Sequence, residues 1–194
     1  MWLSLELLLK NEHSKYFIFS DTHQRLYSKK DCVPKLSPPF LLSTNCRNTR
    51  QIHDLAYQSY EGPPIEAPSI QGAKVNEFSD GSFIAQSEHV IEILHSLTSA
   101  RGDLKGSDIV ILVANASNLS GHLEQLRRLK SRYEFVEQEH IFGDEVRIST
   151  VKRFKGLESS VLIVWGLKEL PEQEKTETEY VGLTRAKSLC YVVN

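Results

Sequence analysis

Cysteine is scarce in this chain, and the spacing of its cysteines excludes two common uses of the residue. Only three occur in 194 residues, at Cys32, Cys46 and Cys190, with no CxxC pair and no cysteine–histidine spacing typical of metal ligands. Neither a disulfide framework nor a zinc site is therefore indicated. Reduced thiols are typical of cytoplasmic proteins, so we expect a cytoplasmic location.

A strong charge of one sign and long apolar runs are also absent. The formal net charge is −2, so the chain as a whole is not attracted to nucleic acid or to an acidic membrane, and a site for a polyanion must be a local patch. No apolar run is long enough to span a membrane. The apolar start MWLSLELLL contains Glu6 and lacks a basic leader, so it predicts an amphipathic helix and not a signal peptide.

The hydrophobic pattern is that of an α/β protein. Continuous apolar segments at 108–114 (DIVILVA) and 160–165 (SVLIVW) predict the buried strands of a parallel sheet. Further strands are expected at 16–19, 40–43, 133–136, 146–150 and 189–193, and helices at about 48–60, 87–98, 117–131 and from 176 onward. This alternation predicts a mostly parallel sheet flanked by helices.

Two helix starts and one basic helix are predicted from local patterns. Asn48 with Gln51, and TETE at 176–179, resemble capping pairs, and residues 65–82 are expected to be irregular. The segment HLEQLRRLKSR (122–132) is consistent with a nucleic-acid patch or with a solvated helix face. The regular spacing of its leucines favours the solvated face.

Four polar clusters lie where predicted strands meet turns or helices. They are SDTHQRLY (20–27), TNCRNTR (44–50), TVKRFKGLE (150–158) and YVGLTRAK (180–187). Each alone is consistent with a solvated turn or a helix cap. Parallel sheets bind ligands at the carboxyl ends of their strands, so we expect Arg47, Lys155 and Arg185 at that edge, beside Gln24 and Glu158. Arginine suits bidentate phosphate contact, and phosphoryl transfer needs cations and a residue that orients water. A phosphate site is the hypothesis.

The same segments resemble the C-terminal part of superfamily I helicases of the UvrD/Rep type. FIFSDTHQRLY resembles the family's third motif, LLSTNCRNTRQI its fourth, VRISTVKRFKGLESSVLIV its fifth and YVGLTRAKSLCYVV its sixth, in family order. The resemblance spans residues 16–193, with little contribution from 61–107. It implies a second RecA-like domain, of the P-loop-NTPase type, at 40–194. A linker at 31–39 and a remnant of the first RecA-like domain at 1–30 would precede it.

The resemblance also implies an ATP site with Mg²⁺ between two RecA-like domains. Gln24 would contact the γ-phosphate and the attacking water, and Arg47 and Arg185 would be arginine fingers. Further nucleotide contacts are implied for Asn45, Cys46, Gly156 and Glu158. Contacts with single-stranded DNA are implied for Tyr27, Thr150, Lys152 and Lys155.

The chain departs from the family pattern in informative ways. Cys46 stands where the family usually has an aromatic residue that stacks on adenine, Lys152 stands in place of a histidine, and Ser159 replaces an aromatic residue. Neither GxxxxGK[ST] nor an apolar strand ending in Asp-Glu occurs in the sequence. The phosphate-binding loop and the Mg²⁺ ligands are therefore expected in a missing N-terminal ATP-binding domain.

Two functions follow from these observations. The first is a portion of an ATP-dependent DNA helicase or translocase that is not ATPase-competent alone. The second is a non-catalytic module that kept the fold and binds nucleic acid or a partner protein. An upstream reading frame with a phosphate-binding loop favours the first, and a natural start at Met1 favours the second. The apolar content of residues 1–30 favours packing on the second domain or association with another copy of the chain.

Overall fold

The computed structural model describes residue 17 and residues 40–60, 62–79, 81–99 and 104–194. Apart from Phe17, the strand expected at 16–19, the remnant domain at 1–30 and the linker at 31–39 lie outside the described residues. Gln24 and Tyr27 lie outside them too. The domain predicted at 40–194 is almost entirely described.

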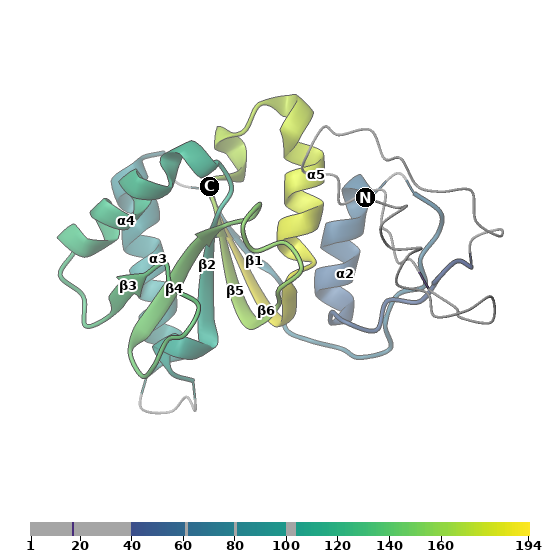
Figure 1. Cartoon of the computed structure of the whole chain (residues 1–194), viewed down its shortest axis with the longest axis horizontal. Helices are drawn as coiled ribbons and strands as arrows, with labels where there is room; N and C mark the ends of the chain where they lie inside the picture. Colours follow the sequence, from purple (N-terminus) through teal and green to yellow (C-terminus); the bar gives the residue numbers. More distant parts are fainter. Residues whose placement is uncertain (1–16, 18–39, 61, 80, 100–103) are drawn as a thin grey trace, which may run out of the picture.

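A six-stranded sheet forms the centre of the molecule (Figure 1), and every pair of neighbouring strands is parallel. The strand order is β1-β6-β5-β2-β4-β3. The strands are β1 (Asn76–Phe78), β2 (Ile109–Val113), β3 (Glu134–Val136), β4 (Glu145–Thr150), β5 (Ser159–Trp165) and β6 (Ala186–Val193). The expected mostly parallel sheet flanked by helices is therefore confirmed.

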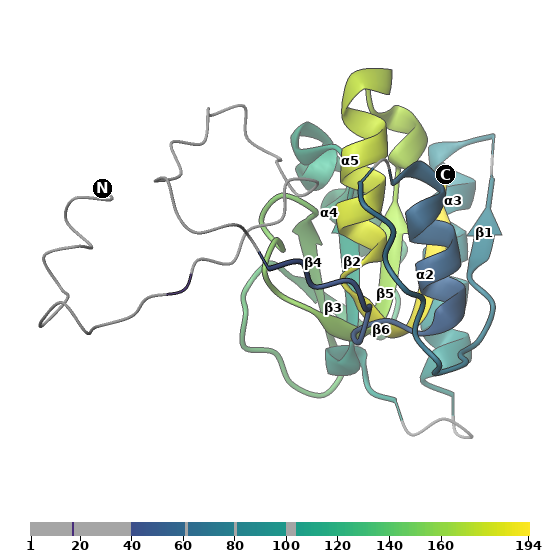
Figure 2. The same ribbon diagram turned by 90° about the vertical axis from the view of Figure 1, so that its right-hand side faces the viewer.

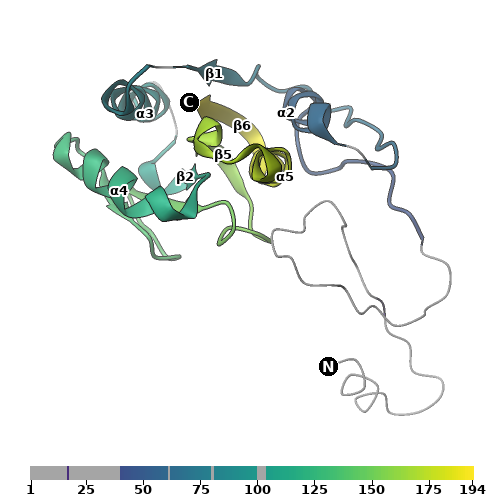
Figure 3. The same ribbon diagram turned by 90° about the horizontal axis from the view of Figure 1, so that it is seen from above.

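Helices cover both faces of the sheet (Figure 3). Helices α3 (Phe83–Leu97) and α4 (Leu119–Arg128) lie on one face, and α2 (Arg50–Ala56) and α5 (Glu172–Leu183) lie on the other. Alternate residues of β2 enter two separate cores, with Ile109 and Ile111 packed toward α3 and α4, and Val110 and Leu112 toward α2 and α5. Burial on both faces explains why β2 and β5 are continuous apolar runs in the sequence.

Short 3₁₀ turns connect several of these elements. They are η1 (Tyr57–Ser59), η2 (Gly106–Asp108), η3 (Ala116–Asn118) and η4 (Leu167–Glu169). Helix α2 with η1 lies beside α5 (Figure 2), where Tyr57 and Tyr180 make an edge-on ring contact at 5.4 Å between centroids. None of the helices in the described ranges is both long and apolar enough to cross a membrane.

The basic segment at 122–132 is mostly helix α4, as its leucine spacing predicted. Leu123 and Leu126 are buried, while Arg128 pairs with Glu124 and Arg127 donates to the carbonyl oxygen of Phe135 at 3.0 Å. These contacts fit the solvated-face interpretation. Contact with nucleic acid at this helix stays an untested alternative.

Three local predictions are wrong. The segment FLLS at 40–43 is not a strand, because it pairs with no strand in the part of the chain that the structure describes. Leu41 and Leu42 are exposed, and the neighbouring Thr44 makes an isolated bridge with Glu66. Helix α5 begins at Glu172 after Pro171 and not at the TETE pair, since proline is tolerated at a helix start. The short edge strand β1 lies in a region expected to be irregular.

Candidate functional site

Three of the four polar segments meet at the amino ends of β5 and β6. Glu158 directly precedes β5 and Arg185 directly precedes β6. The backbone N–H of Ser159 donates to the carbonyl oxygen of Arg185 at 3.0 Å, so these strand starts are adjacent. The expectation that this cluster lies at the carboxyl ends is wrong. A connection between two parallel strands must run back from the carboxyl end of the first strand to the amino end of the second. The motif residues lie at the end of such connections, directly before the next strand begins.

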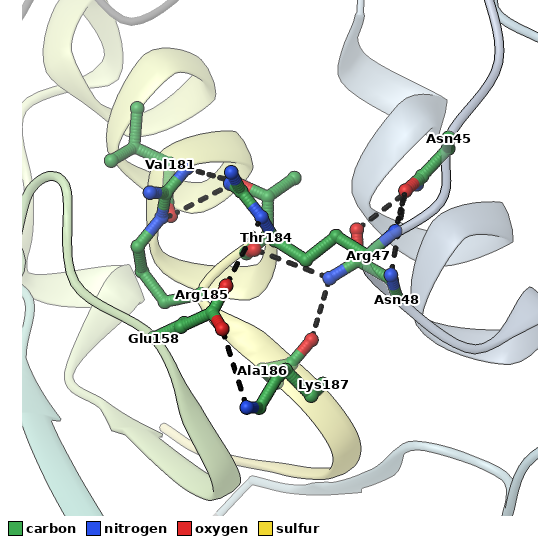
Figure 4. A network of polar contacts seen from close by, with 9 residues as sticks. All are labelled: Asn45, Arg47, Asn48, Glu158, Val181, Thr184, Arg185, Ala186 and Lys187. Carbon is green, nitrogen blue, oxygen red and sulfur yellow. Dashed lines mark hydrogen bonds and ion pairs between the residues drawn. The ribbon is translucent and has the colours of Figure 1, made fainter.

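Glu158 is held between two cations from different segments (Figure 4). Its Oε2 atom lies 3.4 Å from Nε of Arg47, and its Oε1 atom lies 3.2 Å from Nζ of Lys187. All three side chains are about half exposed, so the pairs contribute little to stability. These ion pairs place two positive charges and one carboxylate together at a surface that a polar ligand can reach.

A buried asparagine fastens the Arg47 segment to the turn between α5 and β6. Nδ2 of Asn48 donates to the carbonyl oxygens of Thr184 at 3.2 Å and Ala186 at 2.5 Å. Asn45 supports it, because its Nδ2 donates to Oδ1 of Asn48 at 3.0 Å and its Oδ1 accepts from the backbone N–H of Arg47 at 3.0 Å. The prediction that Asn48 caps a helix is therefore wrong, and Thr49 is the N-cap of α2.

The Asn45 amide also contacts a histidine in α2. Its Nδ2 lies 3.0 Å from Nδ1 of His53. Since an amide nitrogen donates, the histidine nitrogen must accept and the ring must be neutral. Burial lowers the pKa of His53, which favours this neutral form, and the smaller influences of Asp54 and Arg50 oppose one another.

This contact predicts how stability depends on pH. The folded-state pKa of His53 lies below its ordinary value, so the unfolded chain takes up the proton first as pH falls. The free energy of unfolding should then be highest above about pH 6.5 and fall below it. Burial lowers the pKa of His122 as well, so both histidines act in the same direction. Urea titrations at several pH values measure this, and replacing both with glutamine should flatten the profile. A profile unchanged in the double variant would contradict the assignment.

Arg185 differs from Arg47 in its surroundings. It is 2% exposed, its Nε donates to the carbonyl oxygen of Val181 at 3.1 Å, and its Nη2 donates to Oγ1 of Thr184 at 3.2 Å. The guanidinium is thus folded back on the last turn of α5. A contact with a ligand at this edge requires the side chain to turn outward.

Thr150 and Lys152 lie toward the opposite ends of the strands. Thr150 ends β4, is buried, and its Oγ1 accepts from the backbone N–H of Arg153 at 3.1 Å. Nζ of Lys152 lies 3.2 Å from Oε2 of Glu174, near the start of α5. Thr150 and Lys152, two of the residues predicted to contact DNA, are therefore separated by the height of the sheet from Arg47, Glu158 and Arg185.

The remaining predicted residues lie on the surface near these groups. Gly156 has φ of +89°, a left-handed conformation that favours glycine. Lys155 is exposed beside it. Cys46 is exposed next to Arg47, with Sγ 3.9 Å from the carbonyl oxygen of Thr44. The structure thus brings together Asn45, Arg47, Glu158 and Arg185.

Two residues of this cluster were missed by the sequence reasoning. Lys187 lies two positions after Arg185, and its presence in TRAK was a usable signal. The sequence pattern predicts only a local capping role for Asn48, because nothing in a linear pattern shows that its amide reaches carbonyl groups 136 and 138 positions away.

The cluster fits part of a nucleotide. Arginine and lysine match phosphate oxygens, and a carboxylate can accept from a sugar hydroxyl. Among the described residues there is no group of three histidine, cysteine, aspartate or glutamate side chains placed to hold a metal ion. These residues therefore suit the phosphates and sugar and do not themselves suit Mg²⁺.

Comparison with solved structures supports the fold. The chain is similar to the C-terminal domain of a possible DNA helicase from Lactobacillus plantarum WCFS1, with a TM-score of 0.61 and 19% identity over 76% of this chain and 86% of that one. This likeness confirms the predicted RecA-like α/β fold. Two structures of arterivirus nonstructural protein 10, a helicase, align at a TM-score of 0.38 with 9% and 10% identity over 61% of this chain and 28% of theirs, too low to carry an argument. No protein-family model matches the chain, and no curated protein does.

Proposed function

We propose that this chain is the second RecA-like half of an ATP-dependent DNA helicase or translocase of the UvrD/Rep type. One observation carries the proposal. The segments that resemble the fourth, fifth and sixth motifs meet at one edge of the sheet, through the contacts of Glu158 with Arg47 and Lys187 and the bonds of Asn48 to Thr184 and Ala186. Such convergence is what a shared ligand site requires.

In this proposal the cluster completes a nucleotide site whose other half lies in another domain. Arg47 and Arg185 would bind phosphate oxygens of ATP, and Glu158 would orient the sugar, with Asn45 and Asn48 fixing the position of Arg47. Bound ATP with Mg²⁺ supplies the free energy of phosphoanhydride hydrolysis. Arginine donors can stabilise the negative charge that develops during phosphoryl transfer.

The β4–β5 connection would link the nucleotide to the DNA strand. It begins at Thr150 and Lys152, near the carboxyl ends of the strands, and ends at Glu158, at the amino ends. Thr150, Lys152 and Lys155 would contact single-stranded DNA while Gly156 and Glu158 contact nucleotide. A displacement at the DNA end of this short connection would then move the residues at its nucleotide end.

The second candidate is a non-catalytic module that binds nucleic acid or a partner protein. One observation favours it. Glu158 already pairs with both Arg47 and Lys187, and the guanidinium of Arg185 bonds to its own helix. A cluster whose charged groups already have partners within the chain does not require a nucleotide.

An ATPase assay on the 194-residue chain tests the proposal first. We expect no hydrolysis above background, with or without single-stranded DNA, because the sequence contains no GxxxxGK[ST] to hold the phosphates. Robust DNA-stimulated hydrolysis by this polypeptide alone would show that the proposed division of the site is mistaken. Addition of a phosphate-loop domain should restore hydrolysis if the chain is half of a motor, and should not if it is a binding module.

A further inference from the structure

Arg147 in β4 has a buried guanidinium nitrogen, Nε, without a hydrogen-bond partner among the described residues. Its side chain is 12% exposed, its Nε is buried, and no hydrogen bond joins it to any residue that the structure describes. Nη2 lies 3.7 Å from Oε1 of Glu139, but that glutamate is 72% exposed, so the pair is weak. A buried N–H group without a hydrogen-bond partner costs free energy, and such a group calls for an explanation.

Arg147 lines an open hollow of about 380 Å³ near the amino ends of β2 and β5. The guanidinium carbon lies 5.1 Å above the ring of Phe154, which holds the side chain in place. The apolar lining comes from Val110, Phe154, Ile141 and Leu157, and the hydroxyl lining from Ser107 and Ser159. A hollow of this size, with apolar and polar walls in about equal share and Arg147 as the one cation among its lining residues, has the character of a small-ligand or side-chain site.

We propose that this hollow binds a peptide segment of a partner protein, through a carboxylate next to an apolar side chain. The planar fork of Arg147 matches a carboxylate, which can accept two parallel hydrogen bonds from it. The apolar walls would take the neighbouring side chain. Phe142, which is 76% exposed and adjacent to Ile141, extends the apolar surface beyond the hollow.

The charges around the hollow favour a peptide over a nucleic-acid strand. Glu139 and Glu158 both line it, and a strand with a phosphate at every nucleotide would meet both carboxylates. A peptide brings one carboxylate and also backbone N–H groups, which can donate hydrogen bonds to the glutamates. On binding, the peptide carboxylate would take the place of Glu139 beside Arg147.

This site overlaps the proposed nucleotide contacts at two residues only. Neither Arg47 nor Lys187 is among the residues that line the hollow, and only Gly156 and Glu158 are shared with the nucleotide side. The inference does not rest on the proposed function, and its test measures peptide binding and not ATP hydrolysis. The two can therefore fail independently.

The test is a titration of the full ¹⁵N-labelled chain followed by NMR. The probes are acetyl-Leu-Asp-amide, which carries one carboxylate, and its neutral match acetyl-Leu-Asn-amide. We expect the acidic probe to shift the backbone amide signals of Gly156, Leu157 and Ser159. The neutral probe should bind with an affinity at least about tenfold lower, because charge-assisted hydrogen bonds are stronger than neutral ones.

Three variants identify the groups responsible. Arg147→Gln should abolish binding of the acidic probe. Arg153→Gln is the matched control, because Arg153 is an exposed arginine of the same connection that pairs with Glu137 outside the hollow. It should leave binding unchanged. Glu139→Gln should tighten binding a few-fold, since it removes the competing carboxylate.

Several results would overturn the inference. Equal binding of the two probes would do so, as would unchanged binding in a folded Arg147→Gln variant. If that variant does not fold, the exposed Glu139→Gln variant decides, and unchanged or weaker binding would refute the proposal. If a (dT)₁₀ oligonucleotide shifts the same amide signals and the peptide does not, the ligand of the hollow is a nucleic acid and the peptide proposal is refuted.

Discussion

Replacing Arg185 with alanine is expected to lower kcat for ATP hydrolysis about 10³- to 10⁵-fold in a protein that joins this chain to a phosphate-loop domain. An arginine finger contributes a factor of this size because its fixed positive charge stabilises the charge that develops on the phosphoryl oxygens. DNA binding should be largely retained, since Thr150 and Lys152, which are proposed to contact DNA, lie toward the other ends of the strands. Steady-state hydrolysis at saturating single-stranded DNA measures the effect.

Arg50→Ala is the matched control for this experiment. Arg50 is a half-exposed arginine at the start of α2 whose guanidinium pairs with Asp54, away from Glu158. Its removal should change kcat little. Because Arg185 is buried, thermal unfolding must show that its variant is folded; if it is not, the half-exposed Arg47 offers the same test. An unchanged kcat in folded variants would refute the arginine-finger roles.

Asn48→Ala is expected to lower the free energy of unfolding by about 2–3 kcal/mol, because it leaves buried polar groups without partners. The carbonyl oxygens of Thr184 and Ala186 lose their shared donor, and Nδ2 of Asn45 loses an acceptor. The same change frees the Arg47 segment from the α5–β6 turn. Urea-induced unfolding followed by circular dichroism measures the loss.

Gln51→Ala serves as the comparison, because Gln51 is also an amide that bonds across the chain. Its partners are the exposed side chain of Gln71 and the backbone N–H of Gly72. Water can replace bonds at exposed groups, so we expect a loss below about 1 kcal/mol. Equal losses in the two variants would show that Asn48 does not act as the proposed fastening between segments.

The elements that were predicted from sequence are those whose signal is local. Strands β2 and β5 are continuous apolar runs because both of their faces are buried, and helices α3 and α4 have apolar residues at helical spacing. Strand β1 is three residues long and mostly exposed, so its pairing with β6 left no pattern to detect. The start of α5 was misplaced because the TETE pattern fits a cap locally, although those residues lie inside the helix.

The polar residues of the site follow the same division. The sequence by itself determined which segments carry the charge, because Arg47, Glu158 and Arg185 lie in recognisable motifs, and it determined the parallel α/β architecture, because burial on two faces demands apolar runs. Only the tertiary structure decided at which edge of the sheet these segments meet and which carbonyl groups Asn48 reaches. It also decided that Lys187 pairs with Glu158 and that Arg147 lines the hollow. The physical reason is that hydrogen bonds and ion pairs depend on distance in space, while a linear pattern records only distance along the chain.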